Sequence, residues 1–364
     1  MISAIAYIVL GFTVIQLLVA LANLFFETIL PASAGTSGDL VSVLIPARNE
    51  EKTIGNLLDD IINQDYRKIE VIVFNDQSED RTAEIVTKYT ISDSRIILVN
   101  SDGLPEGWLG KNFACHSLSE NAAGKYFLFL DADVRIGNDL IDRAIYFSER
   151  HQLELISIFP KQIIKTFGER ITVPNMNYIL VSLLPLVFVR KLGFPSISAA
   201  NGQFMFFRAD TYRKTKPHEA VKADKVEDIS IARIYKENGE KIACLLGDDS
   251  ITCRMYSGFS EALSGFSKNV IAFFGNSFIL AILFWLITTF GFLPVLFEFS
   301  LPVIIAYMTL YLLTRIFISV SGRQSIFFNL LFIVPLQASM GLFIYMAFIN
   351  KNFNKYQWKG RNID

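Results

Sequence analysis

Two carboxylates follow an apolar run near the middle of the chain. The run Tyr126–Leu130 predicts a buried strand, and Asp131 and Asp133 come directly after it. Open α/β sheets bind ligands beyond the carboxyl ends of their strands, and hard oxygen ligands suit Mg²⁺ or Mn²⁺ carrying a diphosphate. An Asp-x-Asp pair also commonly caps a turn or a helix. The pair alone therefore leaves a metal site and a structural turn both open.

Two earlier strands also end in polar residues. The first predicted strand, Val41–Ile45, leads into a polar turn that contains Pro46, Ala47, Arg48 and Glu50. The second, Ile69–Phe74, is followed by Asp76. We expect these strand ends to face the same crevice as Asp131, because parallel strands end at one edge of a sheet. Glu50 has an alternative role as an acid beside a helix dipole.

Alternating strand and helix patterns place these groups on a mainly parallel sheet. The fold class that they predict is α/β. The remaining predicted elements of this part are the helices Ile54–Gln64, Thr82–Tyr89 and Gly110–Ala123 and the strand Arg95–Val99.

The composition indicates a membrane protein with a water-soluble insert. Of the 364 residues, 52% are hydrophobic and 19% are charged, and the charges crowd into the middle of the chain. The net charge of −1 offers no basic face for nucleic acid. The three cysteines lack CxxC spacing and there are only three histidines, which disfavours a structural zinc site or a disulfide framework.

Four apolar segments are long enough to cross a bilayer. Ile2–Phe26 predicts an uncleaved N-terminal anchor, the alternative being a cleaved signal peptide. A flexible linker, residues 31–38, follows it. Three C-terminal spans are expected over Phe278–Phe297, Leu301–Val320 and Ile326–Ile349.

This count conflicts with the charge of the tail. One N-terminal and three C-terminal spans put the C-terminus opposite the soluble domain, yet Lys351, Lys355, Lys359 and Arg361 favour the cytoplasmic side. One segment is therefore expected to be re-entrant, with the break at Pro335 or within Gly291–Pro294. Arg315, inside the second C-terminal span, is a candidate for contact with a lipid phosphate.

Two further segments are expected at or near the membrane boundary. Tyr178–Val189 is short for a span and contains Pro185, so a buried or interfacial helix is favoured over a crossing. It would either line an acceptor channel or pack under the sheet. Tyr256–Phe274 carries apolar residues at helical spacing and predicts an interfacial helix. Gln357–Arg361 predicts an aromatic and basic interface anchor.

The ordered motifs resemble those of family 2 glycosyltransferases, which have a GT-A-type domain. They are Ile-Pro-Ala-Arg-Asn-Glu-Glu from Ile45, Asn-Asp-Gln-Ser-Glu-Asp-Arg-Thr from Asn75, and Leu-Asp-Ala-Asp from Leu130. The resemblance implies a nucleotide-sugar donor whose base and ribose lie near Pro46–Glu50 and Asp76. Asp133, with Asp131 nearby, would then meet Mg²⁺ or Mn²⁺ and the diphosphate.

The same resemblance suggests a catalytic base. Family members carry a Glu-Asp or Asp-Asp pair, here Glu227 and Asp228, in which Asp228 would deprotonate the acceptor during an inverting displacement. The alternative is an acidic helix start. Gly202 and Gln203, with Glu227, would face the acceptor, although Asn201–Phe207 also predicts an ordinary buried strand.

Three stretches resemble membrane-bound members that glycosylate lipids or carotenoids: Pro105–Asn112, Thr252–Tyr256 and Gly265–Asn269. Lys111 and Arg254 would then face the diphosphate, the alternatives being a helix-start lysine and a surface arginine. The Gln- or Arg-x-x-Arg-Trp motif of many relatives is absent, and Phe266 stands where a tryptophan is expected.

These features together predict inverting, metal-dependent transfer from a nucleotide sugar, a UDP-sugar, to the hydroxyl or carboxyl of a hydrophobic membrane acceptor. Transfer to polyprenyl phosphate or a growing polysaccharide is the alternative within the enzyme class. A nucleotide-binding membrane scaffold or transporter is the non-enzyme alternative. We expect a multi-pass protein of the cell membrane with a cytoplasmic catalytic domain. Its expected parts are an anchor (residues 1–27), a GT-A-like domain (40–255), an interfacial helix (256–275), the C-terminal spans (276–350) and a tail (351–364).

Overall fold

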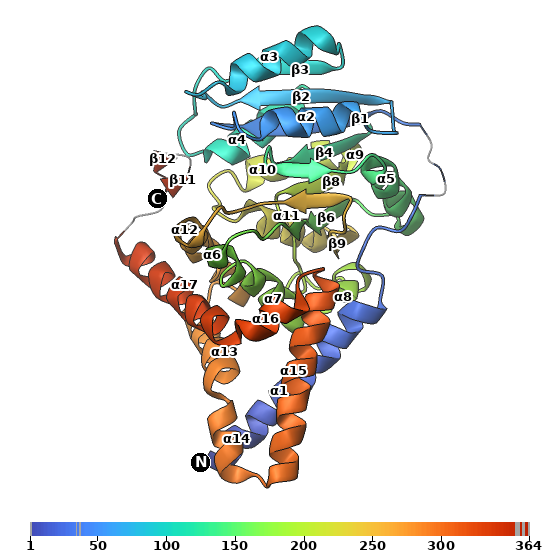
Figure 1. Cartoon of the computed structure of the whole chain (residues 1–364). Coiled ribbons are helices and arrows are strands. Elements are labelled where there is room, and N and C mark those ends of the chain that lie inside the picture. Colours follow the sequence, from blue (N-terminus) through green and yellow to red (C-terminus); the bar gives the residue numbers. More distant parts are fainter. Residues whose placement is uncertain (1, 34, 36–37, 354–356, 359–360, 363–364) are drawn as a thin grey trace.

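The computed structural model describes the whole chain except residues 1, 34, 36–37, 354–356, 359–360 and 363–364. Figure 1 shows an α/β domain above a bundle of long apolar helices. Lys355 and Lys359, two of the four basic residues that favour a cytoplasmic tail, lie outside the described residues, as does part of the predicted anchor Gln357–Arg361. The described parts of that tail include two short antiparallel strands, β11 (Gln357–Trp358) and β12 (Arg361–Asn362).

A mixed seven-stranded sheet forms the centre of the α/β domain. Its order is β3-β2-β1-β4-β8-β6-β9, and β8 is antiparallel to both of its neighbours. The other pairs are parallel, as the alternation of strands and helices predicts. The strands are β1 (Val41–Ala47), β2 (Ile69–Asn75), β3 (Ile96–Asn100), β4 (Tyr126–Leu130), β6 (Leu155–Phe159), β8 (Phe204–Arg208) and β9 (Ile242–Leu246).

The helices of this domain begin close to their predicted starts. In α2, the apolar residues Ile54, Leu57, Leu58 and Ile61 recur at helical spacing and are all buried. The early helices are α2 (Ile54–Ile62), α3 (Thr82–Ser92), α4 (Gly110–Glu120) and α5 (Leu140–His151). The later ones are α6 (Phe167–Arg170), α9 (Ala209–Thr215), α10 (Pro217–Ala220) and α11 (Glu227–Glu237). A small sheet, in the order β5-β10-β7, joins β5 (Val134–Ile136), β10 (Ile251–Cys253) and β7 (Lys161–Gln162).

The segment around Pro185 is a buried pair of helices, not a crossing. α7 (Pro174–Leu183) ends just before Pro185, and α8 (Leu186–Lys191) begins just after it. Most of α7 is buried, and it packs against α1 (Ile2–Phe25), α15 (Leu301–Ser321) and α17 (Ile333–Phe353). The predicted buried helix is thus confirmed, and it lies between the sheet and the apolar helices.

Three helices in the described chain are long and apolar enough to cross a membrane: α1, α15 and Ile333–Lys351 of α17. A bent pair, Phe259–Phe274 with Phe278–Phe290, turns by 100° and would add a fourth if counted as one span. Its parts are α12 (Phe259–Asn269), a short 3₁₀ helix over Ala272–Phe274, and α13 (Phe278–Phe290). The expected N-terminal segment and Leu301–Val320 are each found as one long helix, whereas only the part of Ile326–Ile349 from Ile333 onward belongs to a long helix.

The third expected span, Phe278–Phe297, is wrong as a single helix. α13 ends at Phe290, and α14 (Phe292–Glu298) follows. Pro294 has no N–H to donate to the carbonyl four residues back, at Phe290, so the helix breaks there. Pro335 has the same effect on Leu331, where α16 (Ile326–Leu331) ends before α17. Both predicted break points therefore interrupt a helix.

Asn23 joins the first apolar helix to the break at Pro185. Its Nδ2 donates to the carbonyls of Val181 and Leu184, at 3.0 and 2.9 Å, and its Oδ1 accepts from the Leu186 amide at 2.7 Å. Asn23 is 1% exposed. One buried amide therefore satisfies three backbone groups that the break leaves outside a helix.

Replacing Asn23 by leucine should destabilise the protein by about 1–3 kcal/mol, because buried backbone groups would lose their partners. We expect the unfolding temperature in detergent, followed by intrinsic fluorescence, to fall by several degrees. Asn56→Leu, at an exposed position of α2, is the matched control. Equal unfolding temperatures for the two variants would contradict this role of Asn23.

Candidate active site

A pocket of about 780 Å³ lies at the carboxyl end of β4. The register of the sheet explains its polar floor: Leu130 pairs with Phe204, so Asp131 after β4 lies beside Gln203 before β8. The Asp131 amide donates to the Gln203 carbonyl at 3.3 Å. Of the residues predicted to form a site, seven line this pocket: Lys111, Asp131, Asp133, Gly202, Gln203, Glu227 and Asp228.

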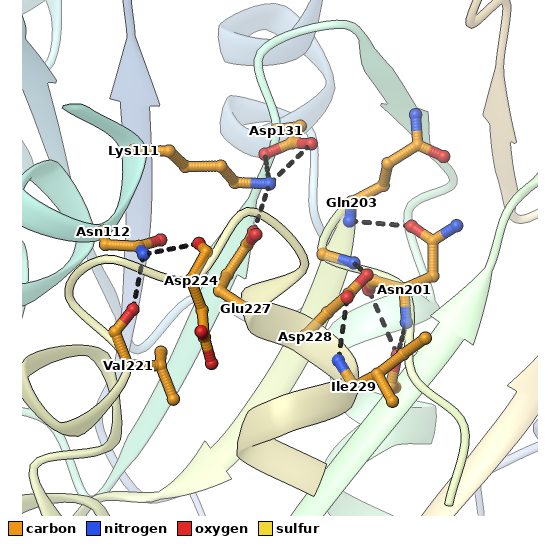
Figure 2. A network of polar contacts seen from close by, with 12 residues as sticks. Lys111, Asn112, Asp131, Asn201, Gln203, Val221, Asp224, Glu227, Asp228 and Ile229 are labelled. Atoms are coloured by element: carbon orange, nitrogen blue, oxygen red, sulfur yellow. Dashed lines mark hydrogen bonds and ion pairs between the residues drawn. The ribbon is translucent and has the colours of Figure 1, made fainter. Parts of the chain in front are cut away.

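Lys111 holds two carboxylates from different elements together. Its Nζ lies 3.0 Å from Asp131 Oδ1 and 3.1 Å from Glu227 Oε1, and the three groups meet at the centre of Figure 2. Lys111 is at the start of α4, Asp131 follows β4, and Glu227 begins α11. Burial by itself disfavours the ammonium, but the two carboxylates outweigh it and raise the pKa of Lys111 well above its usual value. The lysine is therefore charged at neutral pH.

Asp228 is held beside this bridge by backbone amides. Its Oδ2 accepts from the Gly202 amide at 2.9 Å, and its Oδ1 accepts from the Ile229 amide at 2.8 Å. Burial, followed by the charge of Glu227, raises the pKa of Asp228 to about 7. A carboxylate with such a pKa can accept a proton near neutral pH, which a general base must do.

Asn112 fixes the loop that leads into Glu227 and Asp228. Its Nδ2 donates to the carbonyls of Val221 and Asp224, at 2.8 and 3.0 Å, and the side chain is 1% exposed. Our sequence interpretation quoted Asn112 within a motif but gave it no role. The sequence feature that could have indicated this role is that Asn112 is next to Lys111. The same turn of α4 then positions both the charged bridge and the loop before α11.

Asn201 and Gln203 shape the pocket at the start of β8. Asn201 Oδ1 accepts from the Gln203 amide at 2.8 Å. The Gln203 side chain is 5% exposed, and its Nε2 donates to Cys253 Sγ at 2.9 Å. Among the described residues Gln203 Oε1 has no hydrogen-bond partner, although it is buried. A buried acceptor at a pocket wall is suited to a substrate hydroxyl.

The predicted base and ribose region lies at the ends of β1 and β2. Arg48 Nη1 donates to the carbonyls of Asp76 and Gln77, at 2.7 and 3.2 Å, and the Asp76 amide donates to the Ala47 carbonyl at 2.9 Å. Pro46 and Ala47 are the last residues of β1, not a turn after it. These residues are not among those lining the pocket. Glu50 lies close enough for its charge to raise the pKa of Asp131, after the larger effect of burial.

Arg254 is placed differently from the other predicted donor-site residues. Its guanidinium pairs with Glu169, the closest contact being Nη2 to Oε1 at 2.7 Å, and it is not among the pocket-lining residues. Glu169 is fully buried and also accepts from the Thr166 amide at 2.9 Å. The pair therefore ties β10 to the start of α6, and a contact of Arg254 with diphosphate would compete with it.

The residues present fit a divalent cation that is shared with a substrate. The described residues contain no group of three or more His, Cys, Asp and Glu placed to hold a metal. Mg²⁺, however, is commonly held by one or two carboxylates together with substrate phosphates. Asp131 and Asp133 both line the pocket and supply that donor set.

Helices α12 and α7 supply the other wall of the pocket. Ser264, Phe266 and Lys268 of α12 line it, as do Met176 of α7 and Phe273. Our sequence interpretation predicted α12 as interfacial but assigned none of its residues to the site. The helical spacing was visible in the sequence, whereas the direction that each side chain faces depends on how α12 packs.

This mixed α/β fold, with a strand-end carboxylate pair and an acid of raised pKa beside it, is GT-A-like. Residues 42–216 match the family model described as "Glycosyl transferase family 2" and form a domain of that family. The motifs quoted from Ile45, Asn75 and Leu130 all lie within this matched segment.

Curated relatives include two enzymes named 4,4'-diaponeurosporenoate glycosyltransferase. The one from Staphylococcus haemolyticus is 27% identical over 65% of this chain and 62% of its own length. The one from Staphylococcus aureus strain USA300 is 29% identical over 88% of this chain and 87% of its own length. The chain thus spans less than two thirds of the first relative and most of the second.

The solved mannosyltransferase PcManGT from Pyrobaculum calidifontis, in complex with GDP-Man and Mn²⁺, has a similar fold. The two chains superpose with a TM-score of 0.61 at 16% identity, over 98% of this chain and 100% of that one. At this identity the likeness establishes the fold.

Replacing Gly202 by alanine should separate the charged groups of the site. A Cβ there would lie 2.8 Å from Lys111 Nζ and 3.0 Å from Glu227 Oε1, so the bridge would have to shift. A misplacement of about 1 Å at a reacting centre can lower turnover by about 100-fold. We expect a loss of this size for Gly202→Ala in a sugar-transfer assay. Gly193→Ala, where a Cβ meets nothing within 4 Å, should keep full activity. Wild-type turnover in Gly202→Ala would show that the bridge tolerates displacement.

Proposed function

We propose that the chain transfers a sugar from a nucleotide-sugar donor, a UDP-sugar, to the hydroxyl or carboxyl of a hydrophobic, carotenoid-like acceptor. The observation that carries this proposal is a single pocket that is lined by Asp131, Asp133 and Asp228 and also by the apolar side chains of Met176, Phe266 and Phe273. A polar donor and an apolar acceptor would meet there. The names of the Staphylococcus relatives support a carotenoid acid as the acceptor.

In the proposed reaction, Asp228 takes the proton of an acceptor hydroxyl while that oxygen attacks the anomeric carbon. The bond from the anomeric carbon to the diphosphate breaks on the opposite side, so the configuration inverts. Lys111 keeps Asp131 and Glu227 in place, and its charge also favours an approaching diphosphate. Gly202 and the Gln203 amide oxygen would face the sugar or the acceptor.

Asp133, with Asp131, would hold Mg²⁺ or Mn²⁺ in the loaded enzyme. The cation would neutralise charge on the departing diphosphate. The Mn²⁺ and GDP-Man bound by PcManGT support a metal-assisted donor site. Pro46, Ala47, Arg48, Glu50 and Asp76 would surround the nucleoside at the neighbouring strand ends, while Arg254 stays with Glu169 and outside the proposed donor site.

The catalytic base should give the reaction a defined pH profile. Below a pH of about 7, Asp228 is protonated and cannot accept a proton. With a hydroxyl acceptor, kcat/KM should therefore rise by about tenfold per pH unit up to this value and then level off. Asp228→Asn should lower the rate by about 100-fold or more and leave donor binding intact. The exposed Asp210→Asn is the control, and an unchanged rate in Asp228→Asn would contradict the assignment.

Comparing a carboxyl acceptor with a hydroxyl acceptor distinguishes a role of Asp228 in binding from a role as catalytic base. A carboxylate has already lost its proton at neutral pH, so Asp228→Asn should slow its glycosylation far less than that of a matched alcohol. Comparing a carotenoid acid with the corresponding alcohol in both enzymes measures this difference. Equal losses for both acceptors would assign Asp228 a role in positioning and not in proton transfer.

Metal-dependent donor binding tests the carboxylate pair. Asp133→Asn should weaken Mn²⁺-dependent binding of UDP by about tenfold or more, because a carboxylate ligand is lost. Titration calorimetry with and without EDTA measures this effect. Binding in EDTA should be the same for both chains, which makes it an internal control. Unaltered Mn²⁺ dependence in Asp133→Asn would exclude Asp133 as a ligand.

Product partition tests the reaction as a whole. Membranes that contain the chain are incubated with labelled UDP- and GDP-sugars and a carotenoid acid, and the products are extracted into organic solvent. We expect label in the organic phase with a UDP-sugar. In a parallel incubation with the corresponding alcohol as acceptor, Asp228→Asn should lower that label by about 100-fold or more. Label found only in the aqueous phase would exclude a hydrophobic acceptor.

A further inference from the structure

The start of the chain and the turn between α14 and α15 lie together at one end of the helix bundle. Ser3 Oγ donates to Glu298 Oε2 at 2.9 Å, and the rings of Tyr7 and Phe299 are 5.0 Å apart. Figure 1 shows this end farthest from the α/β domain. α1 and the α13–α14 segment both reach this level, and α15 leaves it.

The opposite ends of these helices meet the α/β domain. Asn23, near the end of α1, forms hydrogen bonds with the backbone of Val181 and Leu186, on either side of Pro185. Arg323, just after α15, lies 3.8 Å from Asp249 of the α/β domain. α13 begins a few residues after α12, which lines the pocket. Three segments therefore run the full length between the two levels: α1, α13 with α14, and α15.

The segment α16–α17 is different, because both of its ends stay at the level of the α/β domain. At its start, the Arg170 guanidinium lies 3.9 Å from the centre of the Phe328 ring. At its end, Asn350 Nδ2 donates to Ser267 Oγ of α12 at 3.3 Å. Figure 1 shows α17 rising obliquely beside α12, well above the far ends of α1, α14 and α15.

One face of α17 is packed, and the other is apolar and open. Leu336, Met340, Phe343 and Ala347 are buried at helical spacing, and Phe343 contacts Phe266 of α12 with ring centres 5.0 Å apart. Val334, Tyr345 and Phe348 are more than half exposed on the same helix. Both faces of α17 are therefore apolar, so its composition suits contact with lipid, and the level of its two ends distinguishes a crossing from a helix at the membrane boundary.

We propose that the chain crosses the bilayer three times, with α1, α13–α14 and α15, and that α17 lies along the membrane surface beside the catalytic domain. α17 meets the length and composition requirement for a span, but its contacts return it to the side from which it starts. This resolves the conflict between the predicted spans and the basic tail, since three crossings put the catalytic domain and the C-terminus on one side. The proposal deepens the proposed function, because α17 supports the α12 wall at membrane level.

The distribution of charge sets the orientation. Arg323 and Lys351 flank the ends of the helices on the catalytic side, whereas the far turn, residues 291–300, carries Glu298 as its sole charged residue. Positive residues remain on the cytoplasmic side of the cell membrane. The catalytic domain is then cytoplasmic, and Ser3 and Glu298 face outward.

An aromatic and basic patch marks the membrane boundary on the same side. Phe25, Phe26 and Phe194 are at least half exposed at the end of α1 and just after α8. Lys191 Nζ lies 5.8 Å from the centre of the Phe26 ring. Aromatic rings with cations at a helix end are typical of the headgroup level. This patch and α17 would both contact the same bilayer surface.

Single cysteines test the arrangement without any assay of sugar transfer. Ser300, Ser325 and Lys351 are exposed, and each is replaced by cysteine in turn. Intact cells and permeabilised cells are treated with a membrane-impermeant maleimide. The three native cysteines are buried, so the unsubstituted chain provides the background. We expect Ser300→Cys to label in intact cells, and Ser325→Cys and Lys351→Cys to label only after permeabilisation.

Each other pattern overturns part of the proposal. Labelling of both Ser300→Cys and Lys351→Cys in intact cells would show that α17 crosses the bilayer. Labelling of Ser325→Cys and Lys351→Cys alone in intact cells would invert the orientation. Reporters fused after Asp364 give a second measurement that leaves the helices unaltered: a fluorescent protein should be bright and a phosphatase inactive. Because neither readout uses catalysis, failure of the proposed sugar transfer would leave both results unchanged.

Discussion

The partly buried bridge between Lys111, Asp131 and Glu227 is the interaction on which the rest of the site depends. It joins a strand end to two helix starts that are far apart in the sequence. Without the lysine, the two carboxylates would repel each other in a partly dehydrated pocket. Charge neutralisation therefore holds α11 against the end of β4, and this contact in turn positions Asp228 beside Gly202.

The pocket offers few protein ligands for a cation. Asp131 and Asp133 line the pocket, and the described residues contain no group of three or more His, Cys, Asp and Glu that could hold a metal by themselves, so the proposed cation would need phosphate oxygens as further ligands. Asp228, a partly buried acid with a raised pKa, lies in the same pocket. The proposed displacement at an anomeric carbon would use both the charged groups and this acid.

Helices α7 and α12 line the pocket and also pack against the long apolar helices. α12 presents residues to the pocket on one side and packs against α17 on the other. α7 fills the space beneath the sheet, and Asn23 joins it to α1. The α/β domain and the helices are therefore joined by packing and hydrogen bonds, so the pocket has a fixed position relative to the long apolar helices.

Local sequence determined much of this protein. Apolar runs with polar ends predicted β1, β2 and β4 and the edge at which Asp131 and Asp133 lie, because periodicity and strand-end polarity are local properties. Proline positions predicted where the C-terminal helices break. Pairings depended on tertiary structure: Arg254 turned toward Glu169, Asn112 toward the α11 loop, and α17 back toward α12. Those choices rest on contacts between residues distant in the sequence, and the energy of a buried charge or amide depends on which partner the fold brings to it.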